Sequence, residues 1–163
     1  MDGLVNKEEI MKDGFKLRGN VIIETRRDGK IIDREKLKNL IVNVGKERVA
    51  KLLTQGVGGT AFGYIAIGES SSGDSASASD TALVSEVTRG QADNSGGSYE
   101  ANYKAVFEKT FIFGSGESYS IKEAGVSDSA SASGECLLDR FVFAEKNVDS
   151  DTDLYIKITI TVS

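Results

Sequence analysis

Alternation between two kinds of side chain near the end of the sequence limits the fold more than any other feature. From residue 154 to residue 162 every second position is aliphatic, and the positions between hold Tyr, Lys or Thr. Successive side chains of a β-strand point to opposite faces, so a period of two predicts a strand with one buried face. The other face is expected to be solvated or lightly covered. The aliphatic set is Leu154, Ile156, Ile158, Ile160 and Val162.

Further strand signals lie between loops rich in Ser, Gly and Asp. Asp28-Gly29 predicts a two-residue type I′ turn, because glycine accepts a positive φ without a Cβ clash. Several short strands joined by turn-rich loops predict a mainly β fold, an antiparallel β-sandwich or flattened barrel. The β-branched and aromatic clusters are residues 21–25, 30–33, 39–43, 64–68, 103–113, 120–126 and 136–143.

One helix is predicted, at residues 46–54. Val49, Leu52 and Leu53 fall on one stripe while the charged residues face water, and Gly56 ends the helix. A helix this short is marginal in isolation, so we expect it to pack on the sheet.

Polarity divides the chain into two parts. Residues 1–18 are polar and predict an N-terminal arm, and residues 19–163 predict a single β-rich domain. The chain has no stretch of 18 apolar residues, and charges occupy residues 2–9, where a signal peptide would be apolar. We therefore expect a soluble protein made in the cytoplasm, without a membrane partner.

Charge is also distributed unevenly. Residues 1–55 hold 13 Lys and Arg against 9 Asp and Glu, a net +4, and residues 56–163 hold 7 against 16, a net −9. An acidic body argues against nucleic acid as a partner, because phosphate contacts need clustered positive charge. The basic part can dock on an acidic partner surface. Equally, the charges of both parts can serve only to keep their own surfaces solvated. The candidate docking residues are Lys7, Lys12, Lys16 and Arg18.

Missing residue types argue against an enzyme. The chain has no histidine and one cysteine, so the commonest general acid–base and the usual ligands of zinc are absent. None of the glycine-rich phosphate-binding or nucleophile motifs occurs either. We therefore predict no catalytic residue, no cofactor and no metal, and a chain that is not an enzyme.

A Ser-Ala-Ser-Ala-Ser core occurs in two loops, at residues 74–80 and 128–134. Such small side chains cannot fold alone, so we expect flexible, exposed loops. Two alternatives stay open. Asp74 and Asp80 can hold calcium with the serine oxygens, although the order of EF-hand ligands is absent. The repeated core can also mark a duplicated half-domain.

The order of several motifs resembles that of small structural proteins of tailed bacteriophages, over roughly residues 15–163. The hairpin with its central Asp-Gly comes first, and the alternating C-terminal strand comes last. The segments between are residues 39–45 with the helix, residues 64–68, the motif DTAL at residues 80–83 with residues 86–89, the motif EAG within residues 121–126, and the motif LLDRFVF at residues 137–143.

The resemblance implies a non-catalytic virion protein. The first hypothesis is a head decoration (cement) protein that binds the outer surface of the capsid, in contact with the major capsid protein and with copies of itself, as a homotrimer. A tail, baseplate or fibre-adaptor protein is the alternative. A ligand-binding β module, for example for carbohydrate, is a further alternative, against which stand the absence of tryptophan and of an evident cluster of exposed aromatic residues.

Overall fold

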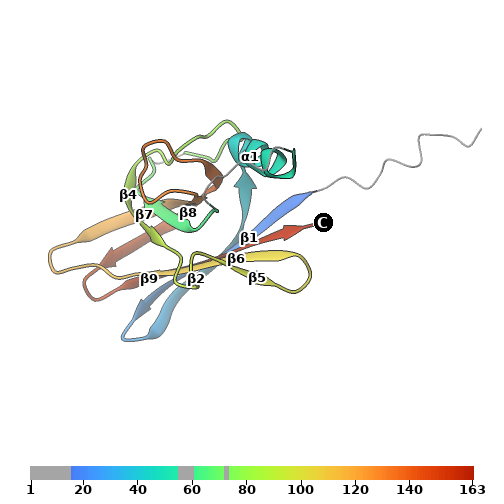
Figure 1. The fold of residues 1–163 in the computed structure, drawn as a ribbon. Coiled ribbons are helices and arrows are strands. Elements are labelled where there is room, and N and C mark those ends of the chain that lie inside the picture. Colours follow the sequence, from blue (N-terminus) through green and yellow to red (C-terminus); the bar gives the residue numbers. More distant parts are fainter. Residues whose placement is uncertain (1–15, 55–60, 72–73) are drawn as a thin grey trace, which may run out of the picture.

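The structure is a computed structural model that describes residues 16–54, 61–71 and 74–163. In this part of the chain nine strands form one curled antiparallel sheet, with one helix packed against it (Figure 1). The predicted mainly β fold with one short helix is confirmed. The elements are β1 (Leu17–Arg27), β2 (Lys30–Ile41), α1 (Asn43–Thr54), β3 (Tyr64–Gly68), β4 (Glu86–Gln91), β5 (Ser98–Glu100), β6 (Lys104–Phe111), β7 (Ser118–Ser127), β8 (Leu137–Asp149) and β9 (Asp153–Val162).

The sheet has the strand order β4-β3-β7-β8-β2-β1-β9-β6-β5, and it curls into a half-barrel. The segment after β4 is bonded to β6, far along the sheet. The Asp93 N–H donates to the Glu108 carbonyl at 2.6 Å, and the Asp93 carboxylate accepts from the Thr110 N–H at 2.7 Å. The Asn94 amide donates to the Val106 carbonyl at 2.9 Å. The bonds at Glu108 and Thr110 cover the part of the β6 edge that lies beyond its pairing with β5.

The concave side of the sheet holds the core. β9 lies between β1 and β6, and Ile158 is paired with Val21 on one side and Phe107 on the other. The predicted alternation in β9 is confirmed for its aliphatic residues 154–160, which are 0–3% exposed. The outward residues of β9 are half-buried. The strand is therefore an interior strand whose aliphatic face belongs to the core.

The β1–β2 hairpin turns at Asp28 and Gly29, whose φ angles of 50° and 72° are those of the predicted type I′ turn. β2 then runs without interruption to Ile41, whereas the sequence predicted two segments at 30–33 and 39–43. The charged run between them obscured the strand, because its residues are exposed or half-buried and continuous pairing with β1 holds them extended.

Two boundaries near the ends of the first elements differ from the prediction. Leu17 and Arg18, which we assigned to the arm, are the first residues of β1 and pair with the end of β9. The helix begins at Asn43 rather than at residue 46. It approaches β8 closely at Gly45, where a Cβ atom would lie 2.4 Å from the Leu138 carbonyl oxygen. Only glycine permits this contact between helix and strand.

β4 and β5 were not among the predicted strands. β4 contains Gly90 and Gln91, and β5 has three exposed residues, so neither shows an apolar alternation. Both are edge strands of the described sheet. Their pairing with β3 and β6 holds them in place instead.

The two faces of β9 give the first prediction. Ile158→Asp places an unpaired carboxylate in the core and should lower the free energy of unfolding by about 4 kcal/mol or more, a large part of a typical 5–15 kcal/mol. Thr159→Asp changes the neighbouring outward residue and should lower it by less than about 1 kcal/mol. Urea unfolding followed by circular dichroism measures both. Equal losses would mean that both faces of β9 are buried in the protein as it exists in solution.

Candidate functional site

Arg140 in β8 is the centre of a buried charge cluster. Its side chain is 1% exposed. Its guanidinium donates to Glu123 in β7 at 2.8 Å, to Asp80 at 2.9 Å and to Asp74. It also donates to the Ser75 carbonyl at 3.3 Å. One arginine therefore ties the first serine-rich loop to the middle of the sheet.

Glu123 completes the attachment from the β7 side. Its side chain is fully buried, and its carboxylate also accepts from the backbone N–H groups of Val84 at 3.1 Å and Ser85 at 2.7 Å. The residues just after the DTAL motif are thus bonded to the EAG motif. Gly125 of the EAG motif lies close to the β8 backbone, since a Cβ atom there would lie 2.4 Å from the Asp139 carbonyl oxygen.

The cluster keeps Arg140 and Asp74 ionised. Burial alone would lower the pKa of the Arg140 guanidinium, but its hydrogen bonds with Asp80, Asp74 and Glu123 raise that pKa above its ordinary value. Hydrogen bonds from Ser70 and from Arg140 hold the pKa of Asp74 below its ordinary value. Asp74 and Asp80 therefore act as partners of an arginine.

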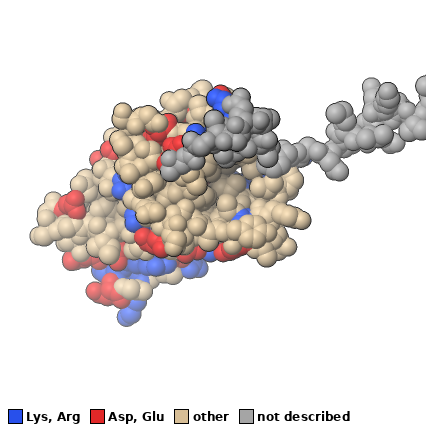
Figure 2. All heavy atoms as spheres, in the orientation of Figure 1, with Lys and Arg blue, Asp and Glu red and all other residues tan. Residues whose placement is uncertain are grey.

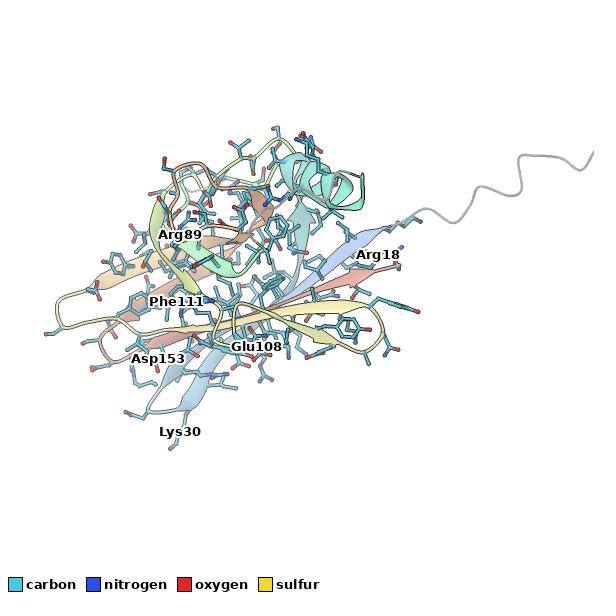
Figure 3. The ribbon with its side chains drawn as sticks, viewed as in Figure 1. Arg18, Lys30, Arg89, Glu108, Phe111 and Asp153 are labelled. Atoms are coloured by element: carbon cyan, nitrogen blue, oxygen red, sulfur yellow. The ribbon has the colours of Figure 1, made fainter. Side chains whose placement is uncertain are left out.

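A second arginine holds the second serine-rich loop. Arg89 in β4 has a 7% exposed side chain and donates to Glu86 at 2.7 Å and to Glu135 at 2.8 Å. It also donates to the Ser127 hydroxyl at 3.2 Å and the Ser129 carbonyl at 3.0 Å. Figure 3 places Arg89 beside the loops at one end of the curled sheet. Its hydrogen bond with Glu86, together with that with Glu135, raises the pKa of Arg89.

These contacts change the expectation of flexible loops. Both described loops are bonded at several points to buried arginines. Among the described residues, no group of three or more acidic, cysteine or histidine side chains has the arrangement of a metal site. The Arg140 and Arg89 clusters hold the backbone and the carboxylates of the two serine-rich loops in place.

A third buried polar group lies beside the first cluster. Asp139 is fully buried, and its carboxyl accepts from the Val126 N–H at 2.7 Å and from the Asn39 amide. Burial raises the pKa of Asp139 to about 7 against these hydrogen bonds, which lower it. The Asn39 Oδ1 is buried without a partner in the described structure. A half-turn of this amide would let it accept from a protonated Asp139.

The predicted docking residues fall in two groups. Lys7 and Lys12 lie outside the described residues. Lys16 and Arg18 are exposed, and the backbones of Lys16 and Ser163 exchange two hydrogen bonds of 2.6 and 2.9 Å. Figure 3 shows Arg18 at this end of β1, close to the C-terminus. The structure thus brings together the two docking residues that it describes.

Sequence reasoning missed Arg89 and Arg140 as anchors and Asp139 as a buried acid. An available signal was the aspartate at each end of the first serine-rich core, which suggested calcium where the structure has a guanidinium. Sequence reasoning also missed a pair of exposed aromatic residues. Tyr99 and Tyr103 are 74% and 70% exposed and line the same hollow, so the argument from a lack of exposed aromatic clusters no longer stands.

No family model, curated protein or solved structure matches this chain. Within the described ranges, no helix is long and apolar enough to span a lipid bilayer. Function therefore has to follow from the residues and their geometry.

The Arg140 cluster gives the second prediction. Arg140→Met leaves Glu123 buried without its cation and should lower the free energy of unfolding by about 3–5 kcal/mol. Adding Glu123→Gln to it should recover part of the loss, because the uncompensated charge is then removed. The control Lys122→Met, which breaks a partly exposed ion pair next to Glu123 on β7, should change it by less than about 1 kcal/mol. Chemical unfolding of the four proteins compares these values. A loss no greater than that of the control would mean that the pair is not buried.

Asp139 gives the third prediction, a pH dependence. The folded-state pKa of about 7 lies above the ordinary 3.8, so the folded protein holds this proton over a range in which the unfolded chain has lost it. The contribution of Asp139 to stability should therefore fall as pH rises from about 4 to about 7, by roughly 4 kcal/mol in total. Asp139→Asn, which mimics the neutral form, should remove this fall. Subtracting the variant's pH–stability curve from that of the wild type isolates the effect from other carboxylates. Parallel curves would show that Asp139 titrates as in the unfolded chain.

Proposed function

We propose that this protein is a non-catalytic structural component of a tailed-bacteriophage virion, and specifically a head decoration protein on the outer surface of the capsid. A tail, baseplate or fibre-adaptor role is the alternative within the same class. Copies of the chain are proposed to associate, as a homotrimer, and to contact the major capsid protein.

The proposal rests on a contact between three of the motifs that carry the resemblance to phage structural proteins. Asp80 of the DTAL motif, Glu123 of the EAG motif and Arg140 of the LLDRFVF motif meet in one buried cluster. Their polar groups are occupied with each other and with backbone. The motifs on which the resemblance rests therefore form one structural unit, which supports an architectural role rather than catalysis.

The convex face of the sheet supports docking on an acidic surface. Lys36 and Lys38 are paired with Ile22 and Asn20 of β1, so they share the outward face with Arg18. No ion-pair partner of these three cations occurs among the described residues. Figure 2 shows Lys and Arg side chains, with Asp and Glu side chains among them, along the lower rim of the molecule, where β1, β2 and β9 lie in Figure 1. This face extends the docking site from Arg18 to Lys36 and Lys38.

Locating the protein in purified virions tests the proposal directly. Mass spectrometry of virions should detect the chain at a fixed ratio to the major capsid protein. Immunogold electron microscopy should place the label on the head. Label on the tail would favour the alternative, and a protein absent from virions would end the proposal of a virion part.

The basic face gives the fourth prediction. The double variant Lys36→Glu, Lys38→Glu should bind undecorated capsids at least about tenfold more weakly than the wild type, and wild-type binding should weaken as salt rises. Lys46→Glu with Lys51→Glu on α1 makes the same change in net charge away from this face and should bind as the wild type does. Co-sedimentation with capsids at several salt concentrations measures the difference. Equal loss in both double variants would show that overall charge, and not this face, controls binding.

A further inference from the structure

A hollow of about 470 Å³ opens beside the β5–β6 hairpin and the end of β9. Its described lining is mostly apolar, and Lys104 is the one residue of that lining with a full charge. Gly97, with a φ of 113°, allows close contact with Phe107, since a Cβ atom there would lie 2.7 Å from its ring. The apolar and aromatic lining comprises Ala61, Phe62, Tyr99, Tyr103, Ala105, Phe107 and Val162.

Backbone strain holds one of the two exposed tyrosines at this hollow. Asn102 and Tyr103 have φ angles of 66° and 60°, in the left-handed region. Asparagine tolerates this region, but a bulky residue such as tyrosine is a genuine outlier there. The Tyr103 carbonyl also accepts from the Val162 N–H at 3.0 Å, which fixes the turn to β9. A tyrosine kept in a strained position and 70% exposed is better explained by a contact than by stability.

The chain itself supplies a segment suited to this hollow. Residues 1–15 precede Lys16, which is bonded to Ser163 beside the hollow's Val162. They hold two Lys against four Asp and Glu, a net −2, and Lys104 has no ion-pair partner among the described residues. Fifteen extended residues span up to about 50 Å. The apolar residues of the segment are Met1, Leu4, Val5, Ile10, Met11 and Phe15.

We propose that the N-terminal segment of one copy of this chain occupies the Tyr99–Tyr103 hollow of a second copy. β1 pairs antiparallel with β9, and Lys16, where the segment joins the described chain, is bonded to Ser163 at the end of β9. The hollow extends from there toward Phe107, which is paired with Ile158 in the middle of β9. Because the hollow extends back along β9 from this point of attachment, a segment that does not reverse its direction can reach only the hollow of a second copy.

The edge of the sheet offers a second element of recognition. β5 is the last strand in the sheet order, and its three residues are exposed. Its free backbone N–H and C=O groups can pair with an extended segment while apolar side chains of that segment enter the hollow. The inference rests on the self-association part of the proposed function, but it does not depend on the capsid as a partner.

Exchange between two defective chains tests the proposal. The first lacks residues 2–14, and the second carries Tyr99→Ser with Tyr103→Asn in the full chain. Sedimentation velocity should show the wild type as an oligomer and each defective chain alone as a monomer. An equimolar mixture of the two should form a one-to-one complex, because one supplies the segment and the other the hollow. As a matched control, Ile112→Ser removes a 77% exposed side chain near the far end of β6 and should leave the oligomer intact.

Thermal unfolding separates lost contact from lost folding. Tyr103→Asn relieves the strained backbone, so in the chain lacking residues 2–14 it should keep or raise the melting temperature while association is lost. An oligomer that persists in either defective chain, or a mixture that fails to associate, would overturn the proposal. A monomeric wild type would overturn it as well. If immunogold labelling still places that monomer on the heads of virions, the decoration role would stand, and the exchange between copies would be ruled out.

Discussion

The position of the loop between β3 and β4 depends on the buried ion pair between Arg140 and Glu123. Both side chains are almost wholly removed from water, and a buried pair is tolerated only when its remaining donors and acceptors are satisfied. The donors of Arg140 therefore require Asp74, Asp80 and the Ser75 carbonyl, and Glu123 requires two backbone N–H groups. The connection from β3 to β4 has to fold over the sheet to supply them.

Edge protection in this chain relies on charge, since the sequence contains no proline. β2 is paired with β8 only at Leu40 and Ile41, so one edge of its charged run has no strand beside it. Lys146 of β8 reaches across to Asp33 at 2.6 Å and Glu35 at 2.9 Å, and these contacts span the gap. Lysine and other charges along an open edge disfavour pairing with another strand. β5, at one end of the described sheet, has a single charged residue, Glu100, and so has little of this protection.

The sequence predicted the elements that depend on local residue patterns. It missed the strands and clusters that depend on partners far along the chain. The alternation in β9, the Asp28-Gly29 turn and the helix follow from spacing and turn chemistry alone. The charged middle of β2 and the whole of β4 and β5 do not, because pairing with a neighbouring strand fixes them. Each arginine binds a loop far along the chain: Arg89 lies 40 positions from Ser129, and Arg140 lies 60 positions from Asp80. Nothing in the spacing of the serine-rich loops shows that their partner is a guanidinium.

The two serine-rich loops are held in a crossed arrangement. Arg89 follows the first loop in the chain but binds the second, and Arg140 follows the second loop but binds the first. Neither loop can reach its final position until the strand beyond the other loop is in place. Because each arginine is buried, a loop that opens leaves charged groups without partners, and this penalty opposes separate opening. Two segments of small, flexible residues thereby become part of the cooperative unit formed by β3, β4, β7 and β8.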